Sequence, residues 1–279
     1  MWSRNKANLY IQDALADFHY DPKALPSPPV QYRMYRDKLM LTHLVGFGGA
    51  AGGAGTSYFF DGSSDALTAP DHADWILGGG TGVFTVDWWH RHSSIGSSLY
   101  FGMEEDGDNR YNCFFHASNG ITFHEIDGAS VNINENQGAT TGWSALTWYH
   151  MALIRGWGGV TDDWAFTRDG STVMTFSNAS AIGNHADLFR IGSTGQASMD
   201  GFTQEFRLSD IARWTADFSA SLPTVEYTSD ANTQLLIHCN ETIASGTTGS
   251  GATFVDSGNT GHTMTEVNQT IRSSAQYKF

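Results

Sequence analysis

Oxygen-bearing side chains that could hold a metal ion gather in the segment "EEDGDN" at residues 104–109. Asp106, Asp108 and Asn109 offer carboxylate and amide oxygens, which are the ligands that a hard cation such as calcium prefers. Their spacing does not match an EF-hand loop. A short acidic segment with a central glycine is also typical of a solvated hairpin tip. We expect a hairpin loop here, with calcium as the one candidate cofactor.

Aromatic side chains beside polar groups indicate a second chemistry, the binding of a sugar. A sugar docks on an aromatic face while neighbouring polar side chains satisfy its hydroxyl groups. In "GVFTVDWWHRH", Trp89 shares the polar side of a predicted strand with Asp87 and Arg91. Trp157 lies in the Gly-rich loop "RGWGGV", where core packing is an equal alternative, and Trp164 begins the next predicted strand. These five residues are the candidate carbohydrate-binding surface.

The composition favours a β-rich fold and disfavours nucleic acid as a partner. The 279 residues include 31 Gly, 9 Trp, 10 Tyr and 17 Phe, and only 4 Lys. Aromatic residues and Gly-rich turns are typical of sheets. The net charge of −14 opposes binding to a phosphate backbone. The charge is uneven, because residues 1–40 carry six Lys or Arg against four Asp or Glu.

The elements that must position these residues are predicted to be short strands joined by tight turns. Apolar and polar residues alternate in several segments, and Asp-Gly pairs, as at 169–170, tolerate the positive φ of a hairpin turn. In "MDGFTQEFRLSDIARWTADF" the alternation predicts a strand that buries Phe202, Phe206 and Leu208. Ser209 is then expected to cap one helical turn, which a buried Trp214 pins against the sheet.

Residues 1–45 differ from the rest and are predicted to form an N-terminal arm. The arm combines a short helix, a Pro-rich linker with prolines at 22, 26, 28 and 29, and a first strand at 38–44. Pro-rich segments are extended and build no core, so the arm is suited to attach the protein to a partner. Neither a secretory leader nor an apolar run of membrane-spanning length is evident.

Several segments, in order, resemble the concanavalin A-like, laminin-G-like jelly-roll domains that are common in bacteriophage structural proteins and bacterial surface proteins. The match covers roughly residues 57–237 and rests on "YFFDGSSDALTAPDHADWILGGGTGVFTVDWWHR", "TWYHMALIRG", "AFTRDGSTV", "LFRIGS" and "MDGFTQEFRLSDIARWTADF". The resemblance implies an all-β fold, a two-sheet antiparallel jelly-roll sandwich over residues 46–279. Residues 229–279 resemble the start of another such domain, so this tail is either a duplicated part that completes the same chain or a segment exchanged with a neighbouring subunit.

Glycoside hydrolysis is the enzymatic alternative that the resemblance raises, since the superfold includes retaining glucanases with an E-x-D-x-x-E strand. Hydrolysis of this kind needs two carboxylates flanking the sugar bond. "HEIDGAS" supplies Glu125 and Asp127, but the third acidic position is Ser130. Neither a Ser-His-Asp motif nor a phosphate-binding loop is evident. The sequence therefore predicts a protein that is not an enzyme and has no catalytic residues.

The resemblance and the arm together favour a non-enzymatic virion structural protein, such as a capsid decoration, head-fibre or tail-associated protein. The arm would contact other virion proteins, the jelly roll would face outward, and the protein would be a homo-oligomer located in the virion. The alternative is a carbohydrate-binding adhesin or receptor-binding module with a cell-surface glycan as its partner. We expect neither nucleic acid nor a membrane as a partner.

Overall fold

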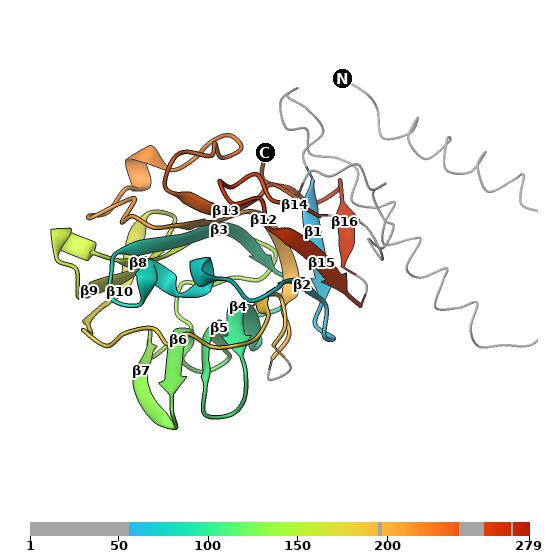
Figure 1. Cartoon of the computed structure of the whole chain (residues 1–279). Helices are drawn as coiled ribbons and strands as arrows, with labels where there is room; N and C mark the ends of the chain where they lie inside the picture. Colours follow the sequence, from blue (N-terminus) through green and yellow to red (C-terminus); the bar gives the residue numbers. More distant parts are fainter. Residues whose placement is uncertain (1–55, 195–196, 240–253, 269) are drawn as a thin grey trace, which may run out of the picture. The chain divides into compact units, whose positions relative to one another are not determined.

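The computed structural model describes residues 56–194, 197–239, 254–268 and 270–279, and the predicted arm at 1–45 lies outside them (Figure 1). The described residues form two antiparallel sheets packed as a sandwich, so the predicted fold class is confirmed. Helix is limited, in this part of the chain, to the short turns η1 (Ala73–Trp75), η2 (Leu77–Gly79), η3 (Trp157–Gly159) and η4 (Ser219–Ser221). None of these is long and apolar enough to cross a membrane.

Sheet A has eight strands and is centred on β3 (Phe84–His92) and β12 (Asp200–Ser209). Its strands follow the order β10-β9-β8-β3-β12-β1-β16, and β13 also pairs with β12. β1 pairs with the first part of β12 and β13 with the last part, so the two strands share one edge. The other strands are β1 (Ser57–Asp61), β8 (Trp148–Arg155), β9 (Asp163–Arg168), β10 (Ser171–Ser177), β13 (Thr233–Ile237) and β16 (Ile271–Ser273).

Sheet B also has eight strands, in the order β14-β15-β2-β11-β4-β5-β6-β7. Its second half is a meander in which each strand pairs with the next along the chain. The strands are β2 (Ala66–Ala69), β4 (Ser98–Glu104), β5 (Arg110–His116), β6 (Gly120–Asp127), β7 (Ser130–Asn136), β11 (Phe189–Ile191), β14 (Phe254–Val255) and β15 (Thr263–Val267).

Aromatic rings dominate the core between the sheets. Trp88 of β3 is fully buried, and its ring centroid lies 5.1 Å from Tyr100 and 5.6 Å from Phe101, both on β4 of the opposite sheet. Phe206 of β12 packs on the same group at 6.0 Å. Alternation along β3 delivers Trp88 to this face, and a bulge between Leu99 and Phe101 lets the consecutive residues Tyr100 and Phe101 both reach it. The core between the sheets therefore explains about half of the Trp and Phe content.

A bulge in β12 changes which side chains the strand buries in the core. The pairing with β3 shifts between Gln204 and Arg207, and Glu205 adopts a φ of 56°. Phe206 lies in the core as predicted, but Phe202 lies on the outer face, where Arg91 covers its ring. Predicting Phe202 in the core was wrong, because the extra residue of a bulge moves the side chains before it to the opposite face.

The helical turn predicted after Ser209 is also wrong, because residues 210–218 are irregular. The Thr85 hydroxyl satisfies two backbone groups of this segment in place of helical hydrogen bonds. It donates to the Ile211 carbonyl and accepts from the Arg213 N–H. Trp214 is only half-buried, and it stacks on Phe218 with ring centroids 3.9 Å apart. The segment is thus held by side-chain contacts instead of a capped turn.

Chain segments from the C-terminal part cover the outer face of sheet A. Trp89 packs there with Tyr227, Leu236 and Phe279, and the Lys278 ammonium lies 4.2 Å from the Trp89 ring. β13 and β16 join sheet A and β14 and β15 join sheet B of the same chain. Duplication or exchange of 229–279 stays a prediction.

Candidate functional site

Sheet B presents a row of amide and aromatic side chains on its outer face. Asn112 of β5 lies opposite His124 of β6, which lies opposite Asn134 of β7. In the next row, Phe114 of β5 lies opposite Thr122 of β6, which lies opposite Asn136 of β7. These positions alternate with core residues, so they point away from the sandwich. We call Asn112, Phe114, His124, Asn134 and Asn136 the Asn-rich face.

A cavity of about 250 Å³ lies at this face. It is smaller than the roughly 300–1,000 Å³ of pockets for drug-sized ligands, which suits a ligand that lies on the surface. Half-buried Phe114 contributes an aromatic side chain and Asn112 an amide. The cavity is lined by Ser97, Leu99, Arg110, Asn112, Phe114, His116, His124 and Ala197.

Asn112 is the most constrained polar group in the cavity. Its side chain is 6% exposed, and its Oδ1 has no hydrogen-bond partner in the described structure. The oxygen lies over Gly102, where any side chain would collide with it. A buried acceptor without a partner costs free energy, about 1–3 kcal/mol, unless a ligand or water supplies a donor. Asn112 is therefore prepared to accept a hydrogen bond from something in the cavity.

The charges around the face leave it suited to uncharged ligands. Burial lowers the pKa of His124, and the positive charge of Arg110 lowers it further. The imidazole is therefore neutral at pH 7, with one nitrogen that donates and one that accepts. Asparagine amides likewise carry both donors and acceptors. Sugar hydroxyl groups need this mixture of partners.

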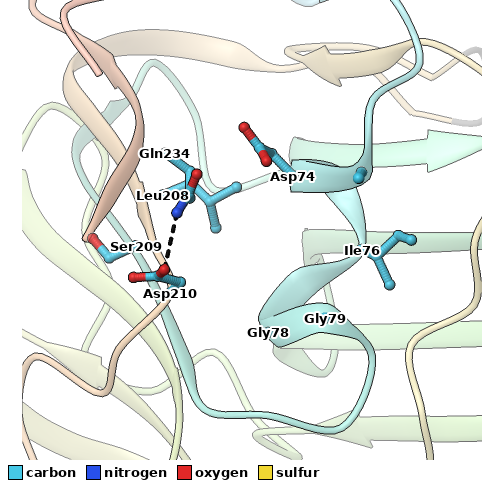
Figure 2. Close-up of a pocket in the computed structure, with 9 residues that line it drawn as sticks. Asp74, Ile76, Gly78, Gly79, Leu208, Ser209, Asp210 and Gln234 are labelled. Atoms are coloured by element: carbon cyan, nitrogen blue, oxygen red, sulfur yellow. Dashed lines mark hydrogen bonds between the residues drawn. The ribbon is translucent and has the colours of Figure 1, made fainter. Parts of the chain in front are cut away.

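A second cavity, of about 200 Å³, lies where η1 and η2 approach the ends of β12 and β13 (Figure 2). Gln234 donates to Asp210 on one wall at 3.0 Å, and Asp74 lies on the opposite wall. Gly78 and Gly79 have positive φ and form the turn that leaves the space open. No aromatic residue is among those that line it, so it lacks a stacking platform for a sugar ring.

Three of the five predicted sugar-binding residues are buried. Trp164 is fully buried in the core, and Trp89 is 2% exposed beneath the C-terminal residues. Asp87 is fully buried and pairs with Arg207. Expecting these three on an accessible surface was wrong: Trp164 points into the core, and the segment 210–232 and the C-terminal residues cover Trp89 and Asp87 on the outer face of sheet A.

The two remaining predicted sugar-binding residues are partly exposed and lie in different surroundings. Arg91 lies over the Phe202 ring at 5.4 Å and donates to the Leu146 carbonyl. Trp157, in η3, packs against the cluster of Ala152, Ile154 and Phe218, as Trp214 does. A role for Trp157 in sugar binding stays a prediction.

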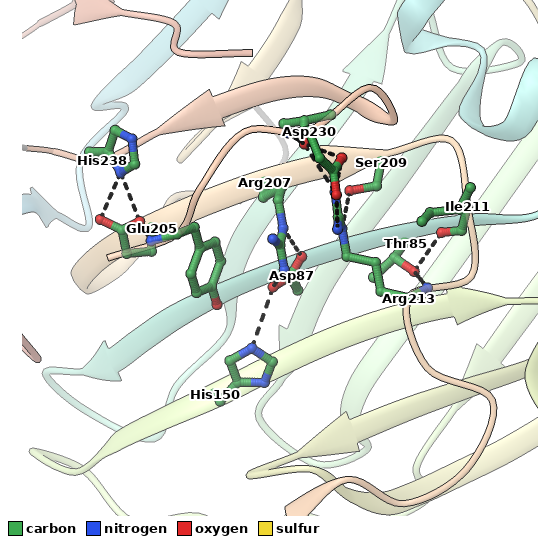
Figure 3. Close-up of polar contacts among 12 residues, drawn as sticks. Thr85, Asp87, His150, Glu205, Arg207, Ser209, Ile211, Arg213, Asp230 and His238 are labelled. Carbon is green, nitrogen blue, oxygen red and sulfur yellow. Dashed lines mark hydrogen bonds and ion pairs between the residues drawn. The ribbon is translucent and has the colours of Figure 1, made fainter. Parts of the chain in front are cut away.

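Asp87 belongs to a polar network under the outer cover of sheet A (Figure 3). Arg207 donates two hydrogen bonds to its carboxylate, at 3.0 and 2.9 Å, and His150 Nε2 lies 3.4 Å away. Burial raises the pKa of Asp87, but the charge of Arg207 and its hydrogen bonds outweigh burial, so the pKa lies below its usual value. These buried contacts connect β3, β8 and β12.

Glu205 and His238 form a second pair in the same region (Figure 3). Glu205 accepts hydrogen bonds from the Tyr227 N–H at 2.7 Å and from His238 Nδ1 at 2.8 Å. Burial raises the pKa of Glu205, and the hydrogen bond to Glu205 raises the pKa of His238. The bulge at Glu205 thus places a carboxylate where it holds the segment that covers sheet A.

The predicted calcium residues form the tip of the β4–β5 hairpin, where Asp106 and Asp108 are exposed. Asp106 accepts from the Asp108 N–H at 2.8 Å and from the Asn109 amide. Asn109 Oδ1 in turn accepts from the Gly128 N–H. Oxygens of Asp106 and Asn109 are thus already engaged, within this turn and with the turn between β6 and β7, and calcium at this tip stays a prediction.

Glu125, which the sequence raised for hydrolysis, is fully buried. It points into the sandwich, accepts from the Gly183 N–H at 3.2 Å and lies 3.7 Å from His185. Its partner in the motif, Asp127, is exposed at the end of β6. Glu125 is thus enclosed and Asp127 exposed, although both carboxylates lie beside Gly183.

Comparisons with known proteins agree with the fold. Neither a scan against protein-family models nor a search of the curated proteins finds a match. Among solved structures, a Bacteroides ovatus protein provisionally described as carbohydrate-binding aligns with a TM-score of 0.54 at 15% identity. The alignment covers 78% of this chain and 59% of that protein, so this chain spans less than two thirds of its length.

Two further structures align less closely. Domain 4 of an extracellular arabinanase from Geobacillus stearothermophilus, solved with arabinotriose, has a TM-score of 0.47 at 14% identity, over 63% of this chain and 83% of that domain. A pentraxin from Limulus polyphemus has a TM-score of 0.43 at 16% identity, over 63% and 86%. The likeness to the Bacteroides ovatus protein, at 15% identity, supports the sandwich fold alone.

Proposed function

We propose that this protein is a carbohydrate-binding module that binds a neutral glycan on the Asn-rich face of sheet B. The observation that carries the proposal is Asn112, a buried amide whose oxygen lacks a partner, beside Phe114 in a surface cavity. Phe114 would stack against the apolar face of a sugar ring, and the amides would pair with its hydroxyl groups. The shared fold with the Bacteroides ovatus protein supports the same class of function.

The glycan is assigned as neutral because of charge. The chain carries a net charge of −14, which repels sialylated or uronic polymers at long range. The face itself contributes amides, a phenyl ring and a neutral imidazole, and the Arg110 guanidinium that also lines the cavity already donates to the Gly107 carbonyl. Hydrogen bonds and stacking, instead of ion pairs, would therefore select the ligand.

Replacing Phe114 by alanine is expected to weaken glycan binding roughly tenfold, about 1.4 kcal/mol, because the stacking surface is lost. Screening the full chain on an array of neutral and acidic oligosaccharides identifies the ligand, and calorimetry then measures the affinity of each variant. Exposed Asn134 provides a second variant, Asn134→Ala, with the same expected direction. The melting temperature of both variants should stay close to that of the parent, since neither side chain belongs to the core.

Trp157→Ala is the matched comparison, because Trp157 is a half-exposed aromatic residue on the other sheet's side of the molecule. Unchanged binding in this variant supports the Asn-rich face. Loss of binding in Trp157→Ala with full binding in Phe114→Ala would move the site to η3 and overturn our assignment. Binding restricted to acidic glycans would contradict the proposed ligand class.

The sequence resemblance also favours a setting for such a module, that of a virion structural protein held by its N-terminal arm. This setting rests on the resemblance and on the basic, Pro-rich character of residues 1–45. Mass spectrometry of purified particles from the source tests it. High and symmetric copy number supports a decoration protein, a few copies at a tip support a receptor-binding protein, and absence from particles contradicts both.

A further inference from the structure

Three side chains with metal-binding atoms meet at one end of sheet B, away from the Asn-rich face. His72 and Asp74 lie at η1, which follows β2, and His262 immediately precedes β15. β2 and β15 pair with each other, with Thr68 opposite Thr265, so the pairing brings the three residues together. One nitrogen or oxygen atom from each lies within 4.8 Å of the others.

The separations approach those of a coordination sphere. Asp74 Oδ2 lies 2.9 Å from His262 Nε2 and 3.4 Å from His72 Nδ1. Tetrahedral coordination with bonds of about 2.0–2.1 Å places neighbouring ligand atoms about 3.4 Å apart. Two of the three separations therefore need changes of half an ångström or less, roughly, and only the two imidazoles must approach each other further.

Two of the three ligands are already held in position. The His262 ring packs on buried Trp75 with centroids 4.3 Å apart, and the Trp75 indole donates to the Pro70 carbonyl at 2.8 Å. Thr260 Oγ1 donates to Asp74 Oδ2 at 2.7 Å and so orients the carboxylate. Supporting contacts of this kind fix ligand geometry in metal sites.

The third ligand has the freedom to complete the site. The His72 side chain is 44% exposed, compared with 18% for Asp74 and 7% for His262. Its Nδ1 accepts a long hydrogen bond, 3.2 Å, from the Asp74 N–H, which it would give up on coordination. The exposed side of the cluster also gives an ion a path from solvent.

We propose that His72, Asp74 and His262 bind one zinc ion. Two imidazoles and one carboxylate are ligands that zinc accepts, whereas calcium and magnesium prefer oxygen alone. Three protein ligands leave a fourth position for water or for an atom of another molecule. The bound ion ties the turn after β2 to the start of β15, and so fastens the C-terminal strands to the sandwich.

Calorimetric titration of the untagged, EDTA-treated full chain with zinc chloride tests the site. The parent is expected to bind one zinc per chain and to melt at a higher temperature with zinc than without, because only the folded chain assembles the site. His72→Gln and Asp74→Asn should each weaken this binding at least tenfold and abolish the rise in melting temperature. Cobalt substitution should give the visible absorption of a tetrahedral site in the parent alone.

His116→Gln is the control, since His116 is a half-exposed histidine on the opposite half of sheet B. It should leave zinc binding unchanged. His72→Gln without zinc should melt like the parent, because His72 is exposed. Zinc binding that persists in His72→Gln and Asp74→Asn would locate the ion at other histidines, and no binding by the parent would refute the site; neither result bears on the glycan assay.

Discussion

Replacing Asp87 by alanine is expected to lower the free energy of unfolding by about 3–5 kcal/mol, the range seen when one partner of a buried ion pair is removed. The substitution leaves the Arg207 guanidinium, which is 9% exposed, without its counter-charge between β3 and β12. It also removes the carboxylate that faces His150. With a typical total stability of about 5–15 kcal/mol, such a loss brings the domain close to unfolding.

Urea unfolding at pH 7 measures this effect, with Asp187→Ala as the matched control. Asp187 pairs with Arg190 at 3.0 Å but is 21% exposed, so its removal should cost about 1 kcal/mol or less. A double variant, Asp87→Leu with Arg207→Met, should recover much of the loss, because no charge is then stranded. Equal decreases in the free energy of unfolding for Asp87→Ala and Asp187→Ala would contradict the prediction, because the buried pair would then contribute no more than the exposed one.

Lowering the pH from about 7 to 4 is expected to destabilise the protein through two buried histidines. His90 and His92 of β3 are fully buried between the sheets. Burial lowers the pKa of His92 from 6.5 to about 4, and burial together with the nearby His92 lowers that of His90 well below 6.5. The folded state requires both rings to be neutral, whereas the unfolded chain takes up protons below its ordinary pKa.

The sign follows from these pKa values. Above pH 6.5 the contribution of the two buried histidines to the free energy of unfolding is fully present. It falls as the pH drops from 6.5 towards 4, because in that window these histidines bind protons mainly in the unfolded state. The shift of His92 alone corresponds to about 3 kcal/mol by pH 4. The raised pKa values of Glu205 and His238 act in the opposite direction, because these groups bind protons more readily when folded.

Urea unfolding of the parent and of His92→Gln at pH 7, 5.5 and 4.5 isolates the effect, because the other groups titrate in both proteins. A Gln side chain retains a polar atom to meet the Tyr100 hydroxyl, which lies 3.0 Å from His92 Nε2. The variant should be less stable than the parent at pH 7 but should lose less stability on acidification. His116→Gln, at a half-exposed position, should follow the parent; parallel curves for all three proteins would contradict the prediction.

Local patterns in the sequence were sufficient to predict the strands and the sandwich. Alternation in "GVFTVDWWHRH" matches β3, whose Phe84, Val86 and Trp88 lie in the core. The Asp169–Gly170 turn has φ values of 50° and 70°, which the residue types allowed. Such features depend on neighbours within a few residues, so a single sequence carries them.

Features that depend on distant segments could not be predicted from those patterns. Trp89 lies on the polar side of its strand, and nothing near it in sequence indicates that Tyr227 and Phe279 cover it. The bulge at Glu205 occurs where β12 exchanges β1 for β13 as its neighbour, without a glycine to mark the positive φ.

The Asn-rich face was missed for a related reason. Asn112, Asn134 and Asn136 alternate with core residues on their own strands, and that signal was present in "RYNCFFHAS" and "SVNINEN". Only the strand register places the amides in rows beside Phe114. The metal-binding cluster likewise combines positions 72 and 262, which sequence spacing cannot relate.

The pairing of β1 with β16 determines how the domain responds to tension. Ser57 lies opposite Ser273, and the pairs continue inward to Phe59 opposite Ile271. The chain before Ser57 and the chain after Ser273 therefore lie at the same end of this strand pair. A force that pulls these two segments apart would break the hydrogen bonds between β1 and β16 one after another. Strands β4 to β7 share no pairing with β1 or β16. A domain stretched between two anchors would thus separate first at the β1–β16 pair, while the strands that carry the Asn-rich face keep their register.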